Sequence, residues 1–423
     1  MNENQRSRLE RLPNELKSIV VVYLGDAQST MNPALTGPEF DSLVTSREVT
    51  IATTMVKSFI GSELMPIALA RYHAAATSEQ DAREESSKSP LYDPQLFFSS
   101  FRNGLAVSPS DRDIVMITEV QFTLKTARKI LQLHSAINYY ARSLAYRAMK
   151  FEPRLTKKLF RCVPEEMKSP SDKELTRFCK ALYIFQLISD LFPFARGGEL
   201  WNQFWLNFSP WENQQLRCLQ LLLADHVDDV ICADDEKRDE PQFPRNDGYT
   251  LTRFMINRGL IELKRLEKDG DVQATQEAVD RYGRQRARGC KEEAWHKGGD
   301  ALWRYDVGPH VSLNVEHIFS AYADDDSGPR DIWLYTLAMM HSEDPMFRDS
   351  DDHMFRCDRC TSYWGFVFWD RAKLDWHTHR CYFPETSEML EGIADLAVGR
   401  AQFRRWNRGR EVAECRSDIL DGC

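Results

Sequence analysis

Four residues near the C-terminus have the types and the spacing of zinc ligands. Cys357 and Cys360 form a C-x2-C pair. Sixteen residues separate Cys360 from His377, and Cys381 lies four positions after His377. Structural zinc is bound by four thiolate or imidazole ligands in a tetrahedron. On a helix, His377 and Cys381 would share one face. The pattern predicts a zinc site made by these four side chains, with His379 as a further ligand candidate.

The same residues can also be explained without a metal. Only one C-x2-C pair is present, and its spacer is longer than in a ββα zinc finger. In this second interpretation the two cysteines are small buried residues, and the histidines are polar positions on an amphipathic segment. A thioredoxin-like redox pair is disfavoured, because no βαβ pattern surrounds it. The other cysteines are mostly scattered singly in apolar stretches, which is typical of reduced thiols in an intracellular protein.

A basic stretch close to the C-terminus has the composition of a nucleic-acid contact. Five arginines lie between residues 400 and 410, with Phe403 and Trp406 among them. However, the whole chain has 55 basic and 64 acidic residues and a net charge of −9, which gives no general attraction to nucleic acid or anionic membranes. We therefore interpret the stretch as an amphipathic helix with its aromatic side chains packed inward. Nucleic acid is not expected as a partner.

Catalytic motifs are missing from the sequence. It contains no GxSxG, no Walker loop, no HExxH and no GxGxxG. His134 and His226 lie in or beside apolar helical stripes, where histidines usually pack in the core or at its boundary. The sequence therefore predicts a protein without enzymatic activity.

The elements that would position these residues are mostly helical. Ser171 with Glu174, and Ser209 with Glu212, each have the spacing of a capping box, and Pro210 suits a first helical position. Apolar residues at helical spacing follow both boxes. A long helix, or two shorter ones, is expected within residues 114–147. Another is expected over residues 251–266, with Gly259 as a weak point inside it.

Loops and one strand complete this outline. Surface connections are predicted for residues 78–94, 234–248, 324–330 and 342–352, which are rich in Ser, Pro, Gly or charge. The best strand candidate is the aromatic and β-branched run Tyr363–Trp369. The fold is therefore expected to be mainly α, with a small aromatic β or zinc-like element near the C-terminus.

The N-terminus carries a helix with a single apolar stripe. Leu12-Pro13-Asn14-Glu15-Leu16 opens the segment, and Pro13 suits a first helical turn. Leu16, Ile19, Val20 and Tyr23 then recur at helical spacing, and Gly25 follows Leu24 as a stop signal.

This motif, with Leu43-Val44-Thr45-Ser46-Arg47 further on, resembles an F-box. The resemblance covers roughly residues 10–55 and implies a compact helical unit that docks on a Skp-type adaptor of a cullin-based ubiquitin ligase. The spacer before Leu43 is longer than in the compact version of the motif. The apolar contact surface that the resemblance implies comprises Leu12, Pro13, Leu16, Ile19, Leu24, Leu43 and Val44. In the alternative interpretation, this helix is buried in the protein's own core.

Two further segments look like fungal F-box proteins of unassigned target. They are residues 62–72, beginning Ser-Glu-Leu-Met-Pro, and residues 363–370, which end in Phe-Trp-Asp. Both segments are apolar or aromatic, so they indicate a role in packing more than a role in a chemical reaction.

Length and composition are those of a globular protein with more than one unit. The chain has 423 residues, 42% of them hydrophobic, and no apolar run approaches the length of a membrane span. We expect an adaptor-binding unit (1–55), a helical domain (56–345) and a C-terminal Cys/His and aromatic module (346–423), located in the cytoplasm or nucleus. The predicted function is recruitment of a substrate to a ubiquitin ligase. The alternatives are a zinc-containing nucleic-acid-binding or regulatory protein, and a structural protein with no ligase role.

Overall fold

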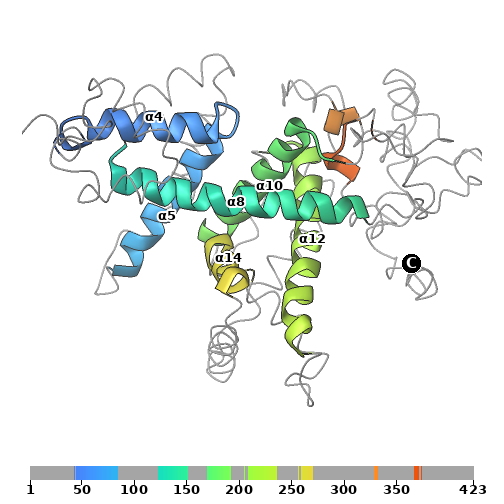
Figure 1. Cartoon of the computed structure of the whole chain (residues 1–423). Coiled ribbons are helices and arrows are strands. Elements are labelled where there is room, and N and C mark those ends of the chain that lie inside the picture. Colours follow the sequence, from blue (N-terminus) through green and yellow to red (C-terminus); the bar gives the residue numbers. More distant parts are fainter. Residues whose placement is uncertain are drawn as a thin grey trace, which may run out of the picture. The chain divides into compact units, whose positions relative to one another are not determined.

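The described part of the chain is helical. In this computed structural model it comprises residues 42, 44–83, 122–150, 169–191, 204, 208–235, 256, 259–269, 328–331, 366–370 and 373. None of these residues is in a strand, which confirms the prediction of a mainly α protein. The elements are α4 (Glu48–Ile60), α5 (Met65–Arg83), α8 (Leu124–Lys150), α10 (Asp172–Leu191), α12 (Pro210–Asp235), α14 (Leu260–Asp269) and the 3-10 helix η5 (Phe366–Phe368) (Figure 1).

The chain divides into two compact units that do not follow one another along the sequence. The first comprises Met1–Tyr140, Tyr183–Pro193 and Gly259–Lys268, and the second comprises Ala141–Leu182, Phe194–Arg258 and Asp269–Cys423. Helices α8 and α10 therefore contribute residues to both units. The domain boundary expected after residue 55 falls inside α4.

In the first unit, α4 and α5 are joined by a short turn. Helix α4 buries Ile51, Met55 and Val56 on one stripe, and it ends at Gly61, whose φ of 76° favours glycine. Segment 62–72 is packed as expected, with its apolar side chains Leu64, Met65, Ile67 and Leu69 all buried. Helix α5 continues to Arg83, so the loop predicted over residues 78–94 is wrong for residues 78–83. Uninterrupted helix-forming residues explain this extension, since Ser78 to Arg83 contains no Gly or Pro.

Polar contacts tie the first unit's helices together. The backbone N–H of Leu124, at the start of α8, donates to Glu48 Oε1 of α4 at 2.9 Å. Arg71 of α5 forms an ion pair with Asp190 of α10, with Nε and Oδ2 2.7 Å apart. Each contact satisfies a helix end or a partly buried charge and joins residues far apart in the sequence.

Gly259 interrupts the helix that was expected over residues 251–266. Its φ is 88°, and α14 begins at the next residue, so the weak point predicted inside a helix is a helix start. The physical reason is a close approach: a Cβ at this position would lie 3.0 Å from the amide atoms of Gln186. Gln186 Oε1 then accepts a hydrogen bond from the N–H of Leu260 at 3.1 Å, which caps α14.

Both predicted capping boxes are confirmed in the second unit. The N–H of Ser171 donates to Glu174 Oε2 at 2.7 Å, and the N–H of Glu174 donates to Ser171 Oγ at 3.2 Å. The corresponding distances for Ser209 and Glu212 are 2.8 and 3.3 Å. Burial alone would raise the pKa of Glu212, but Lys180 and the Ser209 contacts outweigh it and hold the pKa below its ordinary value.

Helix α12 is buried on nearly all sides over its first half. Its predicted apolar face is confirmed by the burial of Leu216, Leu219, Leu222, Leu223 and Val227. The opposite positions are also buried although they are polar, among them Gln214 and Arg217. Farther along α12, Asp225 and Asp229 pair with Arg147 of α8.

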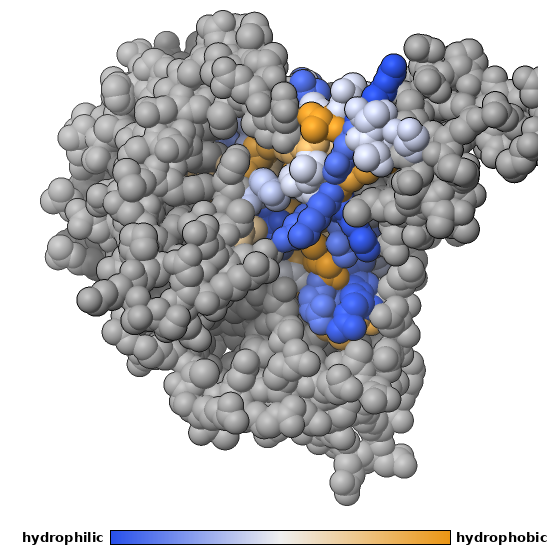
Figure 2. Space-filling model, turned by 90° about the vertical axis from the view of Figure 1, so that its left-hand side faces the viewer, coloured by the Kyte–Doolittle hydropathy of each residue, from blue (hydrophilic) through white to orange (hydrophobic). Residues whose placement is uncertain are grey.

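Few large hydrophobic side chains reach the surface of the described residues. On the face in Figure 2, hydrophilic residues are interspersed with hydrophobic ones. The exposed large hydrophobic residues are Val49, Phe59, Tyr139 and Tyr146. Within the described ranges, no helix combines the length and the apolar character that a membrane span requires.

Residues 328–331 are helical, so the loop predicted over 324–330 is wrong for residues 328–330. Pro329 explains the difference, because proline suits a first helical turn.

Candidate functional site

Most of the residues predicted to bind a metal or an adaptor lie outside the described residues. This holds for the zinc candidates Cys357, Cys360, His377 and Cys381, and for Leu12, Pro13, Leu16, Ile19, Leu24 and Leu43 of the F-box-like motif. Of the seven predicted contact residues, Val44 lies within the described part of the chain. It is helical and 7% exposed, so it offers little surface to a partner.

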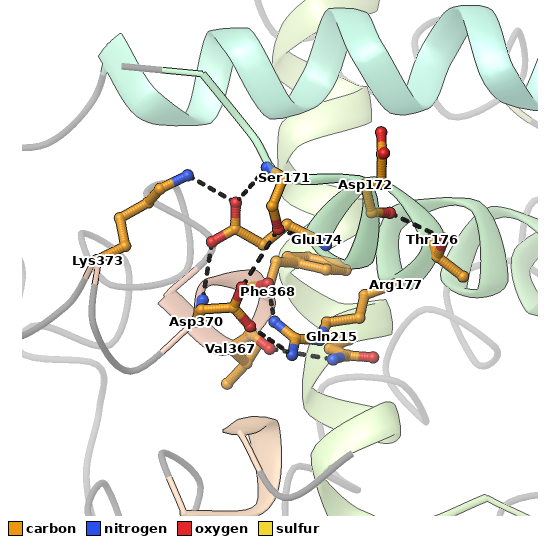
Figure 3. Close-up of polar contacts among 10 residues, drawn as sticks. All are labelled: Ser171, Asp172, Glu174, Thr176, Arg177, Gln215, Val367, Phe368, Asp370 and Lys373. Atoms are coloured by element: carbon orange, nitrogen blue, oxygen red, sulfur yellow. Dashed lines mark hydrogen bonds and ion pairs between the residues drawn. The ribbon is translucent and has the colours of Figure 1, made fainter. Parts of the chain in front are cut away.

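A buried polar cluster in the second unit holds a segment from near the C-terminus against α10 and α12 (Figure 3). We call this cluster the clasp. It consists of Ser171, Glu174 and Arg177 of α10 and its cap, Gln215 of α12, and the residues Val367–Asp370 and Lys373.

The centre of the clasp is an ion pair between Glu174 and Lys373. Glu174 Oε2 and Lys373 Nζ are 2.6 Å apart, and the two side chains are 1% and 5% exposed. Lys373 Nζ also donates to the carbonyl of Ser169 at 2.9 Å, while the N–H of Asp370 donates to Glu174 Oε1 at 2.8 Å. Both oxygens of the buried carboxylate are therefore hydrogen-bonded, as a buried charge requires.

A second ion pair lies beside the first. Arg177 Nη2 and Asp370 Oδ1 are 2.7 Å apart, and Arg177 is 5% exposed. The same guanidinium donates from Nη1 to the carbonyl of Phe368 at 2.8 Å, and Gln215 Nε2 donates to the carbonyl of Val367 at 3.0 Å. Side chains of α10 and α12 thus satisfy the backbone of this segment.

These contacts explain why the strand predicted over Tyr363–Trp369 is wrong for residues 366–369, which are the part of it that the structure describes. Residues 366–368 form the 3-10 helix η5, and Trp369 follows in a bend. A strand needs a neighbouring strand to accept and donate its backbone hydrogen bonds. Here two successive carbonyls are bonded to Arg177 and Gln215 instead. The aromatic and β-branched composition reflects burial, which strands and docked turns share.

Aromatic packing accompanies the charges. The rings of Phe178 and Phe368 stack with their centroids 3.8 Å apart, and Trp369 packs on Phe178 at 5.7 Å. Val367, Phe368 and Trp369 are each 0% exposed. Lys373 Nζ lies 5.1 Å from the centroid of the Trp369 ring, which is within cation–π range. The clasp is thus a docking site that the chain's own segment occupies.

The contact between Glu174, Arg177 and Lys373 was not predicted from the sequence. Glu174 was predicted as a capping residue, which it is, but its second role depends on Lys373, 199 positions away. A charged pair three residues apart, Asp370 and Lys373, directly after an aromatic run was the only local signal. By itself this pair is equally typical of the end of an exposed segment.

A neutral polar cluster occupies the core of the first unit. His134 is 6% exposed, as expected of a core or boundary histidine. Its Nδ1 is 2.9 Å from Tyr183 Oη, and its Nε2 is 2.9 Å from Asn138 Nδ2. With the amide oriented this way, Nε2 accepts and Nδ1 carries the proton. Burial lowers the pKa of His134, although a hydrogen bond with the backbone of Phe59 opposes the shift. We call His134, Asn138 and Tyr183 the histidine cluster.

The described residues also contain a buried phenol and buried thiols. Tyr140 donates to Glu267 Oε1 at 2.9 Å, and burial together with this carboxylate raises the pKa of the phenol. Cys179 and Cys218 are buried as thiols, as expected for reduced cysteines. Burial raises the pKa of Cys179 to about 12, which opposes formation of the reactive thiolate.

The described residues contain no group of three or more His, Cys, Asp or Glu side chains arranged to hold a metal ion. Comparisons of the chain with protein families, curated proteins and solved structures found no match.

Proposed function

We propose that this chain is a non-catalytic, substrate-recruiting F-box subunit of a Skp–cullin–F-box type ubiquitin ligase. The observation that carries the proposal is the N-terminal motif, Leu-Pro-x-Glu-Leu-x-x-Ile with Leu-Val-x-Ser-Arg further on. In this function the N-terminal segment binds a Skp-type adaptor, and the helical remainder holds a target protein. The chain would raise the effective concentration of a target lysine near a ubiquitin-charged enzyme. It would form and break no bond itself.

Because Val44 is buried, it is left out of the proposed adaptor contact. At 7% exposure Val44 is packed within the chain, so it contributes little to an adaptor contact as it stands. The proposed contact surface is accordingly made by the other six apolar residues of the motif, Leu12, Pro13, Leu16, Ile19, Leu24 and Leu43. Leu16 and Ile19 are the best positions to test, because they are three residues apart on the predicted stripe.

Under this proposal, the described helices serve as a scaffold. In the clasp, each of the two cations is within 2.7 Å of a carboxylate, and both connect segments distant in the sequence. In the histidine cluster, a hydrogen bond between His134 and Tyr183 joins α8 to α10. Polar contacts of this kind stabilise a scaffold, and a recruiting subunit would use such a scaffold to hold a target in place.

The test is capture of the adaptor by the full chain. Wild-type protein and a Leu16→Asp, Ile19→Asp variant are each mixed with a purified Skp-type adaptor and recovered by affinity pull-down. A Lys17→Asp, Ser18→Asp variant is the matched control, because it adds two carboxylates to the same predicted helix away from the apolar stripe. Circular dichroism of all three proteins shows whether they fold alike.

The expected result is capture by wild type and control, with at least a tenfold loss in the stripe variant, because two carboxylates would have to be buried at the contact. Equal and negligible capture by all three folded proteins would contradict the proposal. That outcome would favour the interpretation in which the stripe is part of the chain's own core.

A further inference from the structure

Four serines in the chain are followed directly by proline, and the structure describes two of them. Ser209 precedes Pro210 at the start of α12, and Ser169 precedes Pro170 just before the cap of α10. Proline-directed protein kinases transfer phosphate from a nucleoside triphosphate to a serine in this sequence context. The two serines carry the same local signal, so their surroundings decide which of them a kinase can reach.

The surroundings of the two serines differ. Ser209 is 1% exposed, and its hydroxyl donates to Glu212 Oε2 at 3.1 Å, so this serine is enclosed in its own capping box. Ser169 is exposed and lies in a bend outside the helix. The residue before a proline disfavours the helical backbone, and a kinase binds its substrate serine in a non-helical segment. Ser169 is therefore the accessible serine of the two.

A phosphate on Ser169 would lie beside a cation of the clasp. Lys373 Nζ donates to the carbonyl of Ser169 at 2.9 Å and to Glu174 Oε2 at 2.6 Å. An ammonium group has three N–H donors, so these two acceptors use two of them. The Trp369 ring is 5.1 Å from Nζ, and this cation–π contact is weaker than a hydrogen bond to an anion. Because the carbonyl and the hydroxyl belong to one small residue, a phosphate on Oγ can reach the same Nζ.

The acidic groups near this position do not prevent such a contact. Glu174 and Asp370 each form an ion pair with a cation of the clasp. Asp172 is exposed, so solvent screens its repulsion of a phosphate, and the next residue is the exposed cation Lys173. A phosphate, with a charge of about −1.5 to −2 at neutral pH, would therefore meet carboxylates that are paired or solvated.

We propose that Ser169 is a phosphorylation site for a proline-directed kinase and that its phosphate binds Lys373. In the transfer, Ser169 Oγ bonds to the γ-phosphorus of a nucleoside triphosphate, and the bond from that phosphorus to the bridging oxygen breaks. The nucleoside diphosphate leaves, and the hydroxyl proton passes to the base of the kinase. The phosphate adds a charge-assisted hydrogen bond between the start of α10 and the segment that the clasp holds. This inference concerns the second unit alone and is independent of the proposed ligase function.

The first test asks which serine is modified. The full chain is incubated with adenosine triphosphate and a purified proline-directed kinase, and mass spectrometry locates the phosphate. Ser169 should be modified at least about tenfold more than Ser209, because exposure differs while the Ser-Pro signal is the same. Pro170→Ala should abolish modification of Ser169. Similar modification of both serines, or none at Ser169, would overturn the proposal.

The second test examines the contact with Lys373. Replacing Ser89 and Ser108 by Ala removes the two Ser-Pro sites outside the described residues, so the phosphate on Ser169 can be followed by its 31P resonance. A pH titration of this resonance gives the second pKa of the phosphate, which is ordinarily about 6. In the full chain the ammonium group of Lys373 should lower this pKa below its value in a phosphorylated peptide of residues 165–175.

Two matched lysine variants identify the cation. Lys173→Met should keep the lowered pKa of the phosphate, because this lysine is exposed. Lys373→Met, checked for folding by circular dichroism, should raise the pKa toward that of the peptide. Equal pKa values in the full chain and the peptide would contradict the contact, and this comparison decides even if Lys373→Met does not fold. A lowered pKa that persists in folded Lys373→Met would also contradict it, because another group would then be responsible.

Discussion

The clasp and the histidine cluster solve the same problem with different chemistry. Both bury polar side chains between helices, but the clasp buries charges, whereas the histidine cluster uses a neutral imidazole, an amide and a phenol. A buried charge is costly whenever its partner is missing, while a neutral group loses one hydrogen bond. The clasp should therefore respond to a single substitution more severely, and the histidine cluster should respond to pH.

The largest effect is expected from Lys373→Met in the clasp. This substitution keeps the length of the side chain but leaves Glu174 buried without its cation. We expect the free energy of unfolding to fall by about 3 to 5 kcal/mol, toward the lower value because two backbone N–H groups still bond the carboxylate. Urea unfolding of the full chain measures this change.

Lys264→Met is the matched control in the first unit. Lys264 Nζ donates to Ser135 Oγ at 3.0 Å, and this contact is exposed, whereas the ion pair of Lys373 is buried. The control should change the free energy of unfolding by about 0.5 kcal/mol or less. If the two Lys→Met variants lose similar amounts, the clasp charges do not depend on one another as the geometry indicates.

The difference between the two clusters also shows what the sequence could predict. The capping boxes at Ser171 and Ser209 were predicted correctly, since both partners of each box lie within four residues. The long helix containing His134 and the burial of that histidine follow from 3.6-residue periodicity. Local signals of this kind were sufficient for most of the described helices.

Non-local contacts could not be predicted in the same way. The aromatic run before Asp370 has the composition of a strand, and only its contacts with Arg177 and Gln215, more than 150 residues away, make it a 3-10 turn. Gly259 is similar, because the Gln186 amide that lies against it belongs to another helix. The sequence contains these residues but not their pairing, which arises only when the chain folds.

A smaller effect is expected from Tyr183→Phe in the histidine cluster. The phenol is buried and lies 2.9 Å from His134 Nδ1, so removing it takes one hydrogen-bond partner from a neutral ring. The free energy of unfolding should fall by about 1 to 2 kcal/mol. Tyr146→Phe is the control, because this tyrosine is 49% exposed and its substitution should be nearly neutral. Equal losses in the two variants would show that the hydroxyl of Tyr183 does not support the cluster.

The protonation of His134 should make the free energy of unfolding depend on pH. This effect is the smallest at neutral pH, but it separates the two clusters most clearly. Burial lowers the pKa of His134 in the folded chain, so below about pH 6.5 the unfolded chain binds a proton that the folded chain excludes. The stabilisation is complete above that pH and is lost as the pH falls, by at most about 1.4 kcal/mol per pH unit.

Urea unfolding between pH 7.5 and 5.5 tests this expectation. His134→Gln has no group that titrates in this range at position 134, so its free energy of unfolding should fall less steeply with pH than that of wild type. Tyr146→Phe, which leaves His134 and its two hydrogen-bond partners in place, should keep the wild-type slope. Parallel pH profiles for wild type and His134→Gln would mean that the histidine takes up its proton equally well in the folded and unfolded chains. The histidine cluster would then be tolerant of charge, and its contrast with the clasp would disappear.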